Sequence, residues 1–178
     1  MAKQRNDDEK WDAIAGVDGR TRVSQTLGSD PNKALAIARS IEHPWYRCQA
    51  LAEVVDHLDD KQQRSAIIRE ALNAAMENVE PNPVRRQDAA VVLVWHIPDM
   101  PEESLRAVMN AFEAACGEGV GWKTGYNLRW MAELINTRDH GKAVELALMS
   151  GNLRSKRRAL RAIGERELAE RYYETNHP

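Results

Sequence analysis

The chain has 178 residues, of which 43% are apolar and 29% are charged, and its formal net charge is −2. This composition is typical of a soluble globular protein, and the small net charge excludes a global electrostatic attraction to nucleic acid or to an anionic membrane. No stretch approaches the roughly 20 apolar residues that span a bilayer. The two cysteines, Cys48 and Cys116, show no C-x-x-C spacing, which predicts reduced thiols in a cytoplasmic protein, with a single disulfide as the alternative.

The first 29 residues form an N-terminal extension that precedes the regular pattern. Residues 1–10 are strongly polar, which predicts disorder, whereas residues 11–27 are expected to form a short capping helix or a half repeat. Residues 30–172 are predicted to form one αα-repeat domain, and residues 173–178 are expected to fray.

Within the repeat domain, eight helices are predicted in chain order as four hairpins. The first helix of each hairpin (helix A) carries alanines four residues apart in stripes that begin at residues 34, 71, 111 and 143. Such alanines share one helical face and allow a neighbouring helix to approach closely. The second helix (helix B) carries a stripe anchored 17 to 19 residues later, at Leu51, Ala90, Leu128 and Leu160. The predicted pairs are 31–42 with 45–58, 61–79 with 84–97, 102–116 with 122–136, and 139–149 with 153–171.

Capping signals agree with these boundaries. Pro31 suits the first position of a helix capped by Asp30, and Asp60 with Gln63 fits a capping box. The β-branched run at 89–95 would suit a strand, but its register with the other B helices favours a buried helix. One hairpin cannot bury both of its stripes, so the sequence predicts an all-α, right-handed αα-solenoid with more than 60% helix and no sheet.

Over residues 30–170 the pattern resembles the helical-repeat proteins of the tetratricopeptide-like and HEAT-like class. The Trp, Leu-Gly and Tyr set of the tetratricopeptide repeat is not present together, so the resemblance is to the class and not to a single family. What the resemblance implies is an extended groove for a protein or peptide. Some HEAT-like proteins bind DNA, and a few remove damaged bases.

Two tryptophans and a group of cations are the candidate partner-binding residues. Trp45 and Trp122 both open a B helix, where each would either grip a partner or wedge between hairpins. The last B helix is basic, and four of its arginines share one face. That helix would either bind phosphates or form the solvated surface of a capping repeat. The basic candidates are Arg47, Arg86, Arg154, Lys156, Arg157, Arg158 and Arg161.

No pattern of catalytic or metal-binding residues stands out. His57 and His96 occupy equivalent positions, but a zinc site needs three or four converging ligands and none are spaced for it. The sequence contains no phosphate-binding loop, H-E-x-x-H or G-x-S-x-G motif. We therefore expect a non-enzymatic module that binds a protein or peptide, with no cofactor or metal. The alternative is a HEAT-like protein that binds nucleic acid through its basic C-terminal repeat, including one that acts on DNA bases. The sequence leaves the oligomeric state open.

Overall fold

The computed structural model describes residues 2–77, 83–96, 99–118 and 122–174, and this part of the chain holds ten helices and no strand. Helix makes up 82% of the structure, so the predicted all-α class is confirmed. The β-branched run at 89–95 is helical, as its register predicted. In chain order the helices are α1 (Ala2–Leu27), α2 (Pro31–Arg39), α3 (Pro44–Val55), α4 (Lys61–Met76), α5 (Pro83–His96), α6 (Glu102–Glu118), α7 (Trp122–Ile135), α8 (His140–Met149), α9 (Leu153–Ala162) and α10 (Arg166–Glu174). None of the helices in the described ranges is long and apolar enough to cross a bilayer.

Side-chain caps fix where several helices begin. The Asp30 carboxylate accepts a hydrogen bond of 2.9 Å from the Lys33 backbone N–H, and Pro31 takes the first position of α2. Asp60 accepts bonds of 2.7 and 2.9 Å from two backbone N–H groups in the first turn of α4. Both caps were predicted, because the first N–H groups of a helix have no partner within it.

The predicted helix over 153–171 is wrong as one element, because it breaks into α9 and α10. Gly164 has a φ of +95°, a conformation that side chains other than glycine rarely adopt. The Glu165 N–H donates to the Leu160 carbonyl at 2.8 Å, and the Gly164 N–H donates to the Arg161 carbonyl at 3.2 Å. These two bonds form a Schellman motif, which ends α9 and lets the chain turn into α10.

The N-terminal helix is longer than the segment 11–27 that the sequence analysis assigned to it. The backbone of α1 is helical from Ala2, and no proline interrupts it before Leu27. This helix packs against α2 and α3. A Cβ atom at Gly19 would lie 2.7 Å from Ile41 Cγ1, so the absence of a side chain is what allows this close approach. At the other end α10 stops at Glu174, and residues 175–178 of the predicted frayed tail lie outside the described residues.

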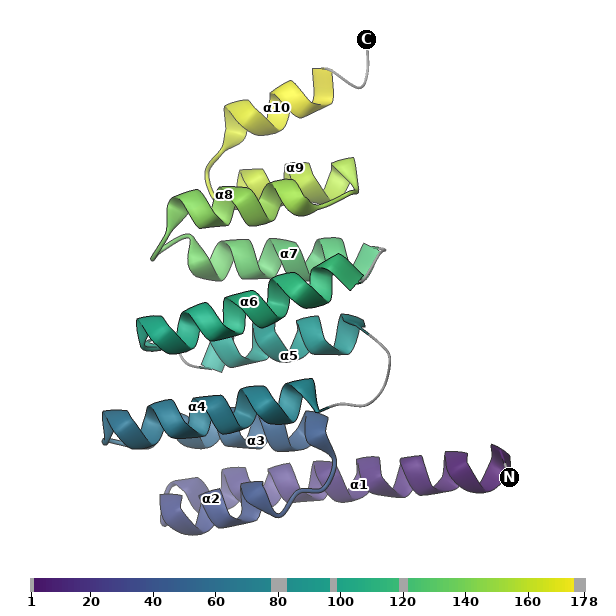
Figure 1. Ribbon diagram of the computed structural model, residues 1–178, viewed down its shortest axis with the longest axis vertical. Helices are drawn as coiled ribbons and strands as arrows, with labels where there is room; N and C mark the ends of the chain where they lie inside the picture. The colour runs from purple at the N-terminus through teal and green to yellow at the C-terminus, as the bar shows by residue number, and fades with distance from the viewer. Residues whose placement is uncertain (1, 78–82, 97–98, 119–121, 175–178) are drawn as a thin grey trace. The chain divides into compact units, whose positions relative to one another are not determined.

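The chain forms two compact units, a division that the sequence analysis did not anticipate. Unit 1 comprises Met1–Pro81 and Val92–Ala111, and unit 2 comprises Asn82–Val91 and Phe112–Pro178. In unit 1, α1, α2, α3 and α4 lie side by side (Figure 1). The fully buried large side chains are Leu51, Ile67, Ile68, Leu93 and Met100 in unit 1, and Phe112, Leu128, Met131, Ile135, Leu146 and Leu160 in unit 2.

Within each unit, an ion pair links neighbouring A helices. In unit 1 the Arg39–Glu70 ion pair of 2.9 Å joins α2 to α4. In unit 2 the Lys142–Glu113 pair of 2.7 Å joins α8 to α6. The alanines of the A stripes are buried as predicted, which explains how neighbouring A helices approach closely enough for such pairs; they are Ala38, Ala75, Ala115 and Ala147.

Candidate binding face

Two aromatic side chains lie exposed on consecutive turns of α7. Trp122 is 76% exposed and Tyr126 is 48% exposed. The apolar side chains of Leu128, Met131 and Ile135 are buried on the other side of the helix, so residues spaced four apart from Trp122 fall on the outer arc. Tyr126 also makes an edge-to-face contact with Trp130, whose ring centroid lies 5.9 Å away. The sequence analysis named Trp122 but missed Tyr126, although their i, i+4 spacing was a usable signal.

The neighbouring helix α9 carries the cations of the predicted basic face. These cations differ in whether a carboxylate already pairs with them. Arg157 and Arg161 both turn to Glu170 of α10, Arg157 at 3.3 Å. The Arg161 hydrogen bond is the main reason that the pKa of Glu170 is lowered. Arg154 and Arg158, by contrast, are exposed, and no carboxylate of the described residues pairs with them.

The remaining cation of α9, Lys156, is half-buried. Its ammonium lies 4.9 Å from the centre of the Tyr172 ring on α10. A cation over an aromatic ring is attracted by the negative face of the ring. Lys156 therefore belongs to the contact between α9 and α10 and does not project freely from the helix.

A close contact between α7 and α9 brings the two exposed sets together. A Cβ atom at Gly125 would lie 2.8 Å from Ser155 Cβ, so the two backbones meet with almost no side chain between them. Tyr126 follows Gly125 on the solvent side of α7, and Arg154 precedes Ser155 on the solvent side of α9. The axes of helices packed in this way lie about 8–10 Å apart. We call the surface formed by Trp122, Tyr126, Arg154 and Arg158 the aromatic–basic face.

Other cations on α7 are already neutralised. Lys123 pairs with Asp88 of α5 at 2.9 Å. Arg129 pairs with Glu133 at 2.6 Å, and its guanidinium carbon lies 5.9 Å from the centre of the Trp130 ring. The charge that the aromatic–basic face offers to a partner therefore comes mainly from α9.

The remaining predicted site residues lie elsewhere. Trp45 is half-buried at the start of α3. Arg47 donates hydrogen bonds of 3.1 Å to two backbone carbonyls of the α2–α3 turn and pairs with Glu77 at 2.5 Å, so it holds this turn against the end of α4. Arg86 is half-buried in α5 of unit 2. Trp45 and Arg47 thus belong to unit 1, and Arg86 belongs to unit 2.

The position of Trp95 within a B helix predicts a place in the core, but this prediction is wrong because the side chain is 55% exposed. The buried arc of α5 includes Ala90, Leu93 and Val94. The residue after Val94 lies one helical step, about 100°, beyond that arc. A position in a B helix is therefore not sufficient to place a tryptophan in the core.

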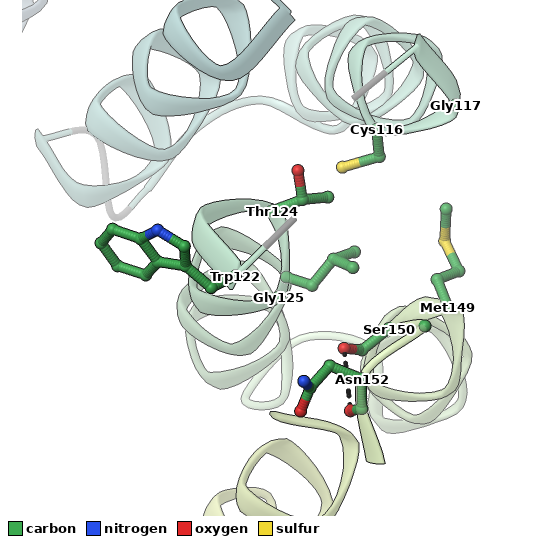
Figure 2. A pocket seen from close by; sticks show the side chains of 10 residues that line it. Cys116, Gly117, Trp122, Thr124, Gly125, Met149, Ser150 and Asn152 are labelled. Atoms are coloured by element: carbon green, nitrogen blue, oxygen red, sulfur yellow. Dashed lines mark hydrogen bonds between the residues drawn. The ribbon is translucent and has the colours of Figure 1, made fainter. Parts of the chain in front are cut away.

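Unit 2 also contains a cavity that the sequence did not indicate. Its volume is about 610 Å³, within the size range of small-ligand sites. Leu128 lines it, and the Cys116 and Met149 side chains flank it (Figure 2). Trp122 also lines the cavity, although its ring points away from both of those sulfur atoms (Figure 2), so the cavity adjoins the aromatic–basic face at this residue. Gly117 and Gly151 at the helix ends leave open space beside it.

The two thiols are suited to structural roles. Burial raises the pKa of Cys48 to about 12 and the pKa of Cys116 to about 12. A nucleophilic or metal-binding cysteine needs its thiolate, and these values disfavour that form at neutral pH.

The histidines form no metal centre among the residues that the structure describes, where no three metal-ligating side chains converge. The His140 ring bridges two groups. Its Nδ1 lies 2.7 Å from Asn136 Oδ1, and its Nε2 lies 2.9 Å from Glu165 Oε1. The His140 ring therefore connects the start of α8 to the turn between α9 and α10.

Comparisons of the chain with protein-family models, with curated proteins and with solved structures find no match.

Proposed function

We propose that the protein is an interaction module that binds a segment of a partner protein on unit 2. The observation that carries the proposal is the exposure of Trp122 and Tyr126 on consecutive turns of one helix. Tryptophan and tyrosine are enriched among the residues that dominate protein–protein binding. The proposal includes an αα-solenoid arrangement of the hairpins, as in tetratricopeptide-like and HEAT-like proteins. The A–A ion pairs within each unit and the Lys123–Asp88 pair between the B helices α7 and α5 of unit 2 support it.

The size of the apolar surface supports this proposal. An aromatic side chain can bury about 150–250 Å² of surface. At 76% exposure, Trp122 would therefore bring about 150 Å² to an interface, or about 4 kcal/mol of gross stabilisation at 25 cal/mol per Å². Losses of motional freedom offset much of such a gain on binding. A preformed helix that is packed against α8 and α9 keeps the loss on this side of the interface small.

The test is selection of short peptides from a displayed random library on the full chain. Binders are then measured against Trp122→Ala, Tyr126→Ala and the control Ile14→Ala, which removes an exposed apolar side chain from α1. We expect a loss of more than about tenfold in the first two variants, since truncating a residue that dominates an interface costs about 2 kcal/mol or more. Binders that tolerate both substitutions, or a library that yields none, would refute the proposal.

The second candidate function is nucleic-acid binding, and exposed Arg154 and Arg158 favour it. Binding that rests on phosphate contacts weakens steeply as salt rises. We expect short duplex DNA to bind weakly at low salt, to be released near physiological salt and to show no sequence preference. Sub-micromolar binding at physiological salt, lost when Arg154, Arg157, Arg158 and Arg161 are all replaced by glutamine, would favour this second function.

A further inference from the structure

The charge on α9 is unbalanced within the helix itself. Its ten residues include five cations and no acidic residue. Arg154 and Arg158 are four residues apart, a spacing at which like charges destabilise a helix by about 0.2–0.5 kcal/mol per pair. Arg154 also lies in the first turn, where the helix dipole favours negative charge. A carboxylate placed near Arg154 and Arg158 would relieve both effects.

Two other arginines of the same helix already have a carboxylate beside them. Glu170 of α10 accepts hydrogen bonds from both Arg157 and Arg161, including 3.3 Å to Arg157 and 3.2 Å to Arg161 Nε. One carboxylate thus serves two arginines that are four residues apart. Arg154 and Arg158 have the same spacing on the exposed side but no such carboxylate among the described residues.

We propose that the aromatic–basic face binds an acidic peptide segment, a proposal that rests on the proposed function and names its partner class. Two carboxylates of the segment lie against Arg154 and Arg158, and one apolar or aromatic side chain of the segment packs on Trp122 and Tyr126. The spacing between Arg154 and Arg158 suits a segment in an extended conformation. Residues four apart on a helix rise by about 6 Å, and residues i and i+2 of an extended strand are about 6.6 Å apart.

Charge favours a peptide over single-stranded nucleic acid as the occupant. A protein that tracks a phosphate backbone uses a positively charged groove along successive nucleotides. The other cations of α7, Lys123 and Arg129, are neutralised by Asp88 and Glu133. Two exposed cations beside two aromatic rings match a short acidic segment with one apolar anchor.

The experiment measures the binding of labelled short peptides to the full chain by fluorescence anisotropy. The acidic peptide alternates aspartate with small polar residues and carries one phenylalanine, and its neutral counterpart has asparagine in place of aspartate. The protein variants are Arg154→Gln with Arg158→Gln, and the matched control Arg22→Gln with Arg106→Gln. The control also removes two positive charges, in this case from exposed arginines of unit 1.

We expect the acidic peptide to bind about tenfold more tightly than the neutral peptide. The Arg154→Gln, Arg158→Gln variant should lose about 3- to 10-fold in affinity for the acidic peptide, because exposed ion pairs each contribute about 0.2–1 kcal/mol. The control should bind like the wild-type protein. Raising the salt from about 0.1 M to 1 M should weaken binding, since the screening length falls from about 10 Å to about 3 Å.

Several outcomes would overturn this inference, and they separate it from the proposed function. Equal binding of the neutral peptide, lost in Trp122→Ala, would leave the binding module in place but remove its preference for acidic partners. Tighter binding of oligothymidylate than of the acidic peptide at physiological salt would make nucleic acid the occupant. A dimer in sedimentation that Trp122→Ala dissociates would make a second copy of the chain the occupant. Failure of both peptides and of library selection would remove the proposed function as well.

Discussion

Replacing Gly125 with alanine tests the contact between α7 and α9 that the aromatic–basic face depends on. The added Cβ atom would lie 2.8 Å from both Ser155 Cβ and Ser155 Oγ, and 3.1 Å from Ser150 Oγ. The hydroxyl can rotate away, but Ser155 Cβ is fixed by the backbone of α9. The two helices must therefore separate to admit one methyl group.

Two effects of opposite sign set the expected magnitude. Alanine is favoured over glycine inside a helix by about 1 kcal/mol. Inserting a methyl group into a packed contact costs about 1–3 kcal/mol. We expect Gly125→Ala to lower the free energy of unfolding by about 1 kcal/mol.

Gly141→Ala is the matched control in the same unit. The added Cβ atom would lie 3.5 Å from its nearest neighbour, Asp139 Oδ1, which is an ordinary van der Waals distance. This change should be neutral or stabilising by up to about 1 kcal/mol. Both variants are compared with the wild-type chain by urea unfolding followed by circular dichroism. If Gly125→Ala is as stable as Gly141→Ala, then α7 and α9 do not meet at Gly125 and the aromatic–basic face is not one surface.

Three further predictions concern packing, a buried thiol and pH. Ala75→Leu should lower the free energy of unfolding by about 1–3 kcal/mol by overpacking, and an unchanged urea midpoint would show that this buried alanine has room beside it. Cys48, which is fully buried and has a pKa of about 12, should react with a disulfide reagent at pH 8 only as fast as the chain opens, and rapid labelling of Cys48 would contradict its burial. Because the pKa of Glu170 is lowered from 4.5 on folding, its contribution to stability is complete above that value and is lost as pH falls through the folded pKa. Thermal unfolding should therefore show the wild-type chain losing stability relative to Glu170→Gln below about pH 4.5, and parallel curves would show that the pairing with Arg161 contributes nothing.

Most helix boundaries could be read from the sequence because local chemistry determines them. Asp30 and Asp60 cap helices with their own side chains. Pro31, Pro44 and Pro83 each open a helix, since the missing N–H of proline is not needed there. The break at Gly164 also depends on local geometry. A glycine within a helical pattern of apolar residues ends the helix only when its φ is positive, and the sequence does not show this angle.

The candidate site was only partly predictable, because equal positions in a repeat do not have equal surroundings. Trp45 and Trp122 both open a B helix, yet one is half-buried and the other largely exposed. Arg157 and Arg158 are adjacent in a basic run, yet Arg157 meets Glu170 and Arg158 is exposed. Side-chain partners from α10 decide this difference, and the turn at Gly164 that brings α10 back was not predicted.

The sequence by itself determined that this chain is all-helical, where most of its helices begin, and which alanines and leucines are buried. Periodicity and capping carry this information, because both act through neighbours within a turn or two of the helix. Only the tertiary structure decided which charges remain available to a partner, that α7 and α9 meet at Gly125 and Ser155, and that a cavity lies beside Cys116. These features depend on residues from 9 positions apart (Arg161 and Glu170) to 30 positions apart (Gly125 and Ser155), and no local pattern records which of them come into contact.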